Sequence, residues 1–213
     1  MVLDRKRGAL NALNALILNA SGAEEAFSAE GSACDRIRGQ FEYVLTIDEG
    51  TRFLPGAARR LIGAIAHPLN RLDVRGGVRH GYAIVQGEMT LSACAEENRF
   101  VRVFAGRGGM DAYPASVSDY FQDVCGMGLF GGKGIYDVRA FAAALEGALP
   151  EGKILSHDMI EGALAGAALA SDIPLYDGFP ATLSSLLKRE NRWMRGDWQL
   201  LPFLKDWVKD AEG

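Results

Sequence analysis

Cysteine is scarce in this sequence, which has three cysteines, Cys34, Cys94 and Cys125. They form no CxxC pair and lack the spacing of metal ligands, so we expect reduced thiols and neither a disulfide framework nor a zinc site. Long apolar runs are also missing, and no stretch of about 18 residues is apolar enough to span a membrane. Basic residues are not in surplus either. The net charge of −4 argues against general nucleic-acid binding and leaves local phosphate binding by a few arginines open.

The beginning of the chain, residues 1–7, is basic, and an apolar stretch follows it. Asn11, Asn14 and Asn19 interrupt that stretch, which is therefore not typical of a signal peptide. The sequence has no repeat of fixed period. With 48% hydrophobic and 23% charged residues, the composition is that of an ordinary globular protein. The length allows one domain with a sizeable core or two small ones, and we predict a single cytoplasmic domain over residues 1–213.

Short apolar runs that favour β-structure alternate with stretches of helical periodicity. Strands are predicted at residues 43–47 and 81–86, a short strand or extended segment at residues 153–156, and a further extended segment around residues 173–176. Helices are predicted at residues 8–20 and 55–66, after Asp137, from Asp158, and in an Arg- and Trp-rich stretch near the end. This alternation predicts an α/β fold with a mostly parallel sheet flanked by helices. Ligands of such folds gather at the carboxyl ends of the strands, where Asp48 and Asp158 fall.

An acidic turn, Asp48-Glu49-Gly50-Thr51, directly follows the first predicted strand. Carboxylate oxygens suit Mg²⁺ or Mn²⁺, and a metal held by Asp48 would neutralise a diphosphate. A solvated turn in which Asp48 or Thr51 caps the next helix is equally open. A phosphatase-type Asp-x-Asp-x-Thr motif does not fit, because Gly50 stands at the second acidic position and Arg52 at the threonine position.

Glycines are dense around Lys133, in the stretch Phe130-Gly131-Gly132-Lys133-Gly134. The stretch looks like a phosphate-binding loop, but it lacks the GxxxxGK[ST] spacing. Met127 stands where the first glycine would be, and Gly134 replaces the Ser or Thr. A phosphate-binding loop and a tight connection therefore both remain open.

A carboxylate that could act as a base occurs in Ser156-His157-Asp158, with Glu161 three residues later. At a strand-to-helix junction, Asp158 is placed to take a proton from an acceptor hydroxyl. The same spacing also fits a structural capping box, in which Asp158 is the N-cap and Glu161 completes the pattern. His157 alone is more often structural than a ligand.

Arginine and tryptophan are concentrated in residues 189–199, which contain Arg189, Arg192, Trp193, Arg195 and Trp198. Guanidinium groups bind diphosphate oxygens in pairs of hydrogen bonds. Indole rings offer a flat, partly apolar surface on which sugar rings stack. An ordinary amphipathic helix with Trp193 in the core is the structural alternative.

Together these motifs resemble the processive inverting glycosyltransferases of the GT-A fold, such as cellulose and chitin synthases. The likeness is greatest to the glycosyltransferase domain of cyclic β-1,2-glucan synthases and runs over nearly the whole chain. The matching stretches are residues 5–8, 47–52, 67–70, 118–119, 122–123, 132–138, 155–158, 161–162 and 192–202. The resemblance implies a GT-A-like α/β domain that begins after its first nucleotide-binding unit, and thus a partial domain.

The resemblance implies glucose transfer from UDP-glucose to a growing β-1,2-glucan with inversion at the anomeric carbon. Asp158 would be the general base, and Asp48 would help to hold Mg²⁺ or Mn²⁺ on the diphosphate. The implied partners are UDP-glucose, a glucan acceptor and the remaining parts of a larger inner-membrane synthase. The implied location is the cytoplasmic face of that membrane.

The resemblance also implies donor- and acceptor-binding residues. Arg189 and Arg192 would face the leaving diphosphate, and Trp193 would lie near the acceptor terminus. Lys6 and Arg7 match a basic segment near the nucleotide. The same assignment extends to the less specific matches Lys133, Trp198 and His157.

Two positions depart from the family pattern. Gly50 stands where the family has a second aspartate, so we expect weakened metal binding unless Glu49 turns inward, which strand alternation disfavours. Arg189 stands where the wider family has glutamine. A non-catalytic remnant that binds glucan or a partner chain is therefore an alternative to the active transferase. An unrelated hydrolase or phosphatase built on Asp48 is a third interpretation.

Overall fold

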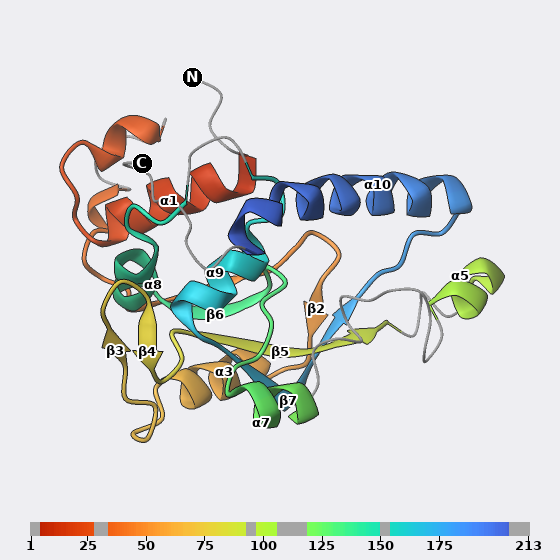
Figure 1. The fold of residues 1–213 in the computed structure, drawn as a ribbon. Coiled ribbons are helices and arrows are strands. Elements are labelled where there is room, and N and C mark those ends of the chain that lie inside the picture. The colour runs from red at the N-terminus through yellow and green to blue at the C-terminus, as the bar shows by residue number, and fades with distance from the viewer. Residues whose placement is uncertain (1–4, 28–33, 93–96, 106–118, 150–153, 205–213) are drawn as a thin grey trace.

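The computed structural model describes residues 5–27, 34–92, 97–105, 119–149 and 154–204 (Figure 1). Within these residues the centre is a five-stranded sheet with the strand order β1-β6-β5-β7-β2. Its strands are β1 (Tyr43–Thr46), β2 (Arg52–Phe53), β5 (Ile84–Leu91), β6 (Gly134–Asp137) and β7 (Ala167–Asp177). A separate hairpin pairs β3 (Asp73–Val74) with β4 (Val78–His80).

The sheet has a parallel core with antiparallel neighbours. The long strands β5 and β7 run parallel, from the pair Ile84 and Ala167 to the pair Leu91 and Asp177. Strand β6 is antiparallel to both β5 and β1, and β2 is antiparallel to β7. The predicted α/β class is thus confirmed. The sheet itself is mixed. The sequence could not predict this, because alternation of strands and helices along the chain does not determine the direction in which each strand enters the sheet.

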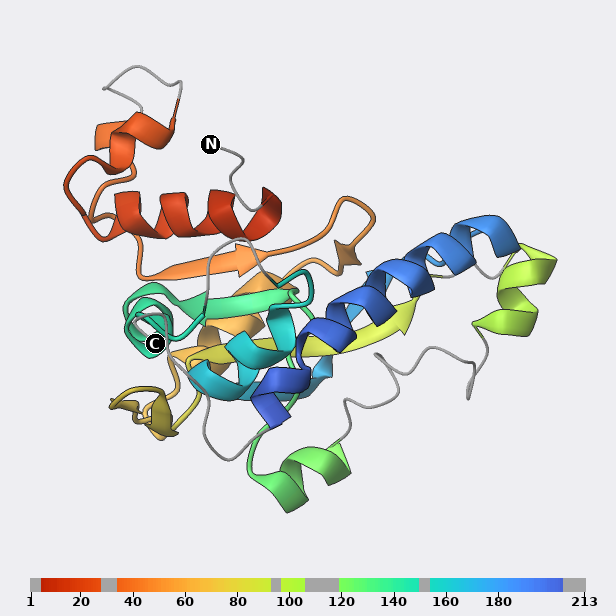
Figure 2. The ribbon, with the colours of Figure 1, turned by 45° about the horizontal axis from the view of Figure 1, so that its top comes forward.

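Helices cover both faces of this sheet, as Figures 1 and 2 show. Helix α3 (Ala57–Ile65) packs on one face, against Val85 of β5 and Ile135 of β6. The other face carries α1 (Arg5–Ile17), α8 (Val138–Leu145) and α9 (Asp158–Ala165). There Ile84 and Tyr136 point into the second half of the core, because neighbouring residues of a strand face opposite ways.

The remaining helices lie outside these two layers. They are α5 (Arg99–Phe104), α7 (Asp119–Cys125), α10 (Leu183–Gln199) and the 3₁₀ turns η1 (Ala23–Ala26) and η2 (Leu201–Leu204). The C-terminal half of α10 is docked beside the segment that precedes α9 (Figure 2). The backbone N–H of Leu155 donates to Gln199 Oε1 at 2.8 Å. Gly196 lies so close to Ser156 that an added Cβ would be 1.8 Å from its Oγ.

Two sequence predictions about strands need correction. Of the two alternatives for residues 153–156, a short strand or an extended segment, the strand is absent over the described residues 154–156, and α10 contacts this segment through Leu155. Strand β7 is much longer than the predicted segment 173–176 and begins at Ala167. Its alanine-rich first half favours helix by propensity, and pairing with β5 overrides that preference.

Candidate active site

Asp48 lies two residues after β1 and is held by two lysines. Lys6, in the first turn of α1, donates from Nζ to Asp48 Oδ1 at 2.7 Å and to the carbonyl of Gly132 at 3.0 Å. Lys133 Nζ lies 3.4 Å from Asp48 Oδ2. Partial burial by itself favours the protonated acid. The hydrogen bond from Lys6 and the charges of both lysines outweigh burial and lower the pKa of Asp48.

Asp177, the last residue of β7, belongs to the same cluster, although no sequence motif pointed to it. Lys133 Nζ donates to Asp177 Oδ2 as well as approaching Asp48. Thr51 Oγ1 lies 3.4 Å from Asp177 Oδ1, and it accepts the backbone N–H of Asp48 at 3.3 Å. The signal that could have found Asp177 is its position at the carboxyl end of a strand, the rule that also selected Asp48.

Gly132 joins this cluster to Asp158. Its φ of +76° lies in the left-handed region that glycine adopts freely. A Cβ placed on Gly132 would lie 2.9 Å from both carboxylate oxygens of Asp158. The backbone at Gly132 therefore passes directly against the Asp158 carboxyl group, and its carbonyl oxygen accepts a hydrogen bond from the ammonium of Lys6. Two carboxylates that are distant in the sequence thus share one site.

Asp158 is the first residue of α9 and is not its N-cap. His157 occupies the cap position, and no side chain makes a capping hydrogen bond there, so the capping-box interpretation is wrong. The side chain of Asp158 is 34% exposed. Burial raises its pKa, and the negative charges of Glu161 and Asp48 add to that effect against the opposing charges of His157 and Lys6. A partly exposed carboxylate with a raised pKa is suited to accept a proton.

A buried ionic network lies behind Asp158. His157 Nδ1 is 3.0 Å from Glu161 Oε2 and 3.3 Å from Asp158 Oδ1, without the alignment of a good hydrogen bond. Arg7 Nε lies 3.6 Å from Glu161 Oε1. Arg7, which the resemblance assigns to the nucleotide, therefore forms a buried ion pair with Glu161. Burial favours neutral His157, but the contact with Glu161 and the charges of both carboxylates outweigh it and raise the pKa of His157.

This raised pKa predicts a pH-dependent stability. The folded state holds the His157 proton more tightly than the unfolded state, whose ordinary pKa is 6.5. The stabilisation is complete below that pH and is lost as pH rises through the folded-state pKa. We expect the free energy of unfolding of the native chain, relative to His157→Gln, to fall as pH rises above the ordinary histidine pKa of 6.5 in denaturant titrations. His80 is exposed, so the native chain compared with His80→Gln should show no such fall. An equal fall in that comparison would contradict the assignment of the pH dependence to His157.

The expected Mg²⁺ or Mn²⁺ at Asp48 stays a prediction. Among the described residues, His157, Asp158 and Glu161 form a group whose ligand atoms lie within 4.8 Å of one another. Arg7 contacts Glu161 of that group, and the raised pKa of His157 favours its charged form. An ionic network therefore accounts for the grouping of these three side chains. Both oxygens of Asp48, by contrast, face lysine ammonium groups.

The α10 residues that the sequence assigns to the donor and acceptor lie on one helix. The guanidinium of Arg189 lies over two aromatic rings, 4.7 Å from the centroid of Phe179 and 4.5 Å from that of Trp193. Arg192 is exposed, and Trp198 is 69% exposed. The structure thus brings Lys6, Lys133, Asp48 and Asp158 together. The C-terminal end of α10 reaches the segment before Asp158, where Gln199 accepts the backbone N–H of Leu155.

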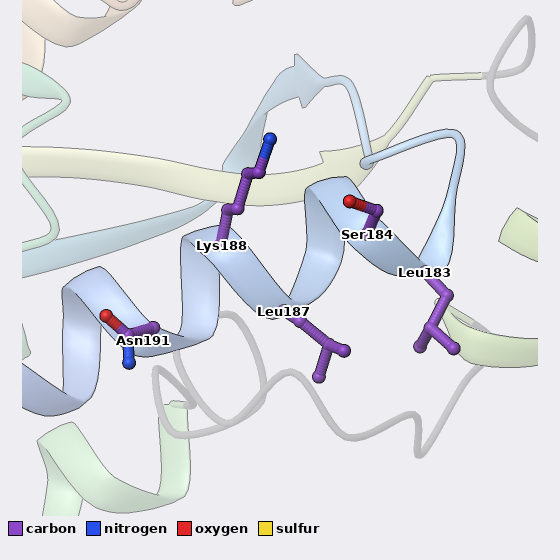
Figure 3. Close-up of a pocket in the computed structure, with 5 residues that line it drawn as sticks. All are labelled: Leu183, Ser184, Leu187, Lys188 and Asn191. Atoms are coloured by element: carbon purple, nitrogen blue, oxygen red, sulfur yellow. The ribbon is translucent and has the colours of Figure 1, made fainter.

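A groove runs along the first half of α10 and is lined by Leu183, Ser184, Leu187, Lys188 and Asn191 (Figure 3). Leu183 and Leu187 point to one side of the helix and Lys188 to the other (Figure 3). None of the predicted site residues lines this groove, so it is distinct from the cluster around Asp48 and Asp158.

A comparison with known proteins found a longer relative that contains a matching segment. The chain is 39% identical over 206 residues to the cyclic beta-(1,2)-glucan synthase NdvB of Rhizobium meliloti (strain 1021). It is homologous to a segment of a cyclic β-1,2-glucan synthase. The aligned region covers 94% of the chain and 7% of the synthase, and the observed α/β fold is compatible with a GT-A-like domain. No protein-family profile matches the chain.

The homology confirms the resemblance to cyclic β-1,2-glucan synthases that the motifs indicate. The synthase is much longer than this chain, so the activity of the whole enzyme is a matter for proposal. No helix in the described part of the chain has the length and apolar character needed to cross a membrane.

Proposed function

We propose that this chain is part of a glycosyltransferase domain that transfers glucose from UDP-glucose to a growing β-1,2-glucan with inversion. The proposal is supported by the homology to a cyclic β-1,2-glucan synthase. The observation that carries it is the placement of Asp158. This carboxyl group has a raised pKa and is partly exposed to solvent. It lies against Gly132, whose carbonyl accepts a hydrogen bond from Lys6, and both Lys6 and the neighbouring Lys133 contact Asp48.

In the proposed reaction Asp158 is the general base. Its carboxylate takes the proton of an acceptor hydroxyl while the hydroxyl oxygen attacks the anomeric carbon of the donor glucose. The bond from that carbon to the diphosphate breaks on the opposite face, and UDP leaves. This single displacement inverts the configuration at the anomeric carbon.

The leaving diphosphate gains negative charge as its bond to glucose breaks, and cations near it lower the barrier. Lys6 and Lys133 provide two ammonium groups at Asp48, and Lys6 also donates to the carbonyl of Gly132, the residue that lies against Asp158. Arg192 and Trp198, exposed on α10, are assigned to the donor and the glucan acceptor. Trp198 offers an open ring face on which a glucose ring stacks.

Calorimetric titration of UDP-glucose into the purified chain, with and without Mn²⁺, tests the donor assignment. We expect saturable binding that UDP competes away, because the diphosphate supplies most of the recognised charge. A transfer assay with a β-1,2-glucan acceptor then measures UDP release. Absence of binding under both conditions would contradict the proposal.

A non-catalytic glucan-binding role is the second candidate, and the exposure of Trp198 and Met194 on α10 favours it. In that role the chain would bind glucan without binding UDP-glucose. Titration of the chain with β-1,2-glucan, followed by tryptophan fluorescence, separates the two. If the chain binds glucan but not UDP-glucose, and Trp198→Ala abolishes the glucan binding, the glucan-binding role would replace the transferase proposal.

A further inference from the structure

Lys133 lies between two carboxylates at the point where a cation is expected. Its Nζ contacts Asp177 Oδ2 and lies 3.4 Å from Asp48 Oδ2. The side chain of Lys133 is 15% exposed, whereas those of Asp48 and Asp177 are 48% and 30% exposed. The Lys133 side chain is thus more enclosed than either carboxylate side chain, and its Nζ lies at the contact between them.

Asp177 approaches the place that Gly50 leaves vacant. A Cβ built on Gly50 would lie 3.7 Å from Asp177 Oδ1. A carboxylate from β7 therefore already lies next to the side-chain position of residue 50. Thr51, which is buried, holds this geometry because its hydroxyl bridges the backbone of Asp48 and the carboxylate of Asp177.

A divalent metal does not fit this arrangement of residues. Mg²⁺ and Mn²⁺ need carboxylate oxygens that are free to coordinate them. One Asp48 oxygen accepts a hydrogen bond from Lys6, and the other faces Lys133, which also pairs with Asp177. A metal would have to displace Lys133 from both of its carboxylates.

An ammonium group carries three N–H donors, and the two carboxylate contacts of Lys133 account for two of them. Lys6 likewise uses two contacts, to Asp48 and to the Gly132 carbonyl. Counting the contacts within the described residues, each ammonium has one N–H left to donate to a phosphate oxygen. The two lysines approach Asp48 from opposite sides of its carboxylate, one at each oxygen.

We propose that Lys133, held between Asp48 and Asp177, is the cation of the donor diphosphate site, so that this chain binds the diphosphate without a divalent metal. The inference rests on the proposed function, in which the donor is a nucleoside diphosphate sugar. Asp177 is then a positioning residue, which acts by holding the ammonium in place. Loss of Lys133 would leave Asp48 and Asp177 as an open pair of carboxylates for a metal.

The test is calorimetric titration of UDP into the chain, first in EDTA and then in saturating Mn²⁺. We expect binding in EDTA and little change in affinity when Mn²⁺ is added. Lys133→Met should weaken binding in EDTA by about tenfold to a hundredfold, the equivalent of one charge-assisted hydrogen bond. Asp177→Asn should weaken it less, because Lys133 remains present but is held by one carboxylate.

The matched control is Asp172→Asn. Asp172 also lies on β7 and forms an exposed ion pair with Arg60 of α3, so its replacement should leave UDP binding unchanged. Circular dichroism of each variant establishes that it folds. Lys133→Arg, which keeps the charge, should retain most of the metal-free binding even if Lys133→Met proves unstable.

Metal binding gives an independent readout. Electron paramagnetic resonance of added Mn²⁺ should detect tight binding in Lys133→Met and not in the native chain, and Lys133→Met with Asp177→Asn should lose it. If the native chain binds UDP only when Mn²⁺ is present, the inference is overturned and the proposed function stands. If it binds UDP under neither condition, the proposed function fails as well. Metal-free binding that survives Lys133→Met unchanged also overturns the inference.

Discussion

Asp158→Asn is expected to lower the rate of glucose transfer by about 10²- to 10⁴-fold, the usual contribution of a general base. The amide keeps the size of the carboxyl group but cannot take the proton of the acceptor hydroxyl. Donor recognition depends on Lys6 and Lys133, so the affinity for UDP-glucose should change little. UDP release in the presence of glucan and calorimetric binding of UDP-glucose measure the two effects separately.

The pH profile of transfer supplies a second check on the same residue. Burial and nearby negative charge raise the pKa of Asp158, and only its ionised form acts as a base. The rate should therefore fall as pH is lowered through this raised pKa, at a pH where an ordinary aspartate is still ionised. Retention of transfer by Asp158→Asn, or an equal loss in the Asp172→Asn control, would remove Asp158 from this role.

Gly132→Ala is expected to abolish most of the transfer while the chain remains folded. Alanine at a φ of +76° costs about 1–2 kcal/mol. The added methyl group would also lie 2.9 Å from the carboxylate of Asp158 and push it away. Because a displacement of about 1 Å in a catalytic group can cost about 10²-fold in rate, the loss of activity should exceed what the loss of stability explains.

Gly126→Ala is the matched control for this variant. Gly126 has a similar φ of +71°, and nothing lies within 4 Å of the position of its added Cβ. It therefore reproduces the backbone strain without the contact with Asp158. Denaturant unfolding should show similar losses of stability in the two variants, and the transfer assay should separate them. Equal rates of transfer would refute the close approach of Gly132 to the base.

Local patterns in the sequence predicted most of the elements around the site. The strand before Asp48, the helix capped by Asp137 and the helix that begins at Asp158 all appear in the structure. Asp137 accepts the backbone N–H of Ala140 at 2.8 Å, as a helix cap should. These elements were predictable because apolar periodicity and capping act over a few residues of the chain.

The capping-box interpretation was wrong because His157, and not Asp158, occupies the cap position of α9. The strand alternative for the segment before Asp158 was wrong because of tertiary packing. The segment 154–156 has extended character in the sequence, but α10 holds it as a loop through Leu155, Ser156 and Gln199. No local pattern carries information about that packing. The roles of Arg189, Arg192, Trp193 and Trp198 in binding stay predictions.

The sequence by itself determined the α/β class, the family resemblance and the four residues Lys6, Asp48, Lys133 and Asp158 of the cluster. Only the tertiary structure decided that these residues meet, because Lys6 reaches Asp48 across the fold and Gly132 passes against Asp158. It also decided that Asp177 completes the cluster. The pairing of β7 with β2 and β5 places that carboxylate beside Gly50, and such long-range pairing leaves no local signal in the chain.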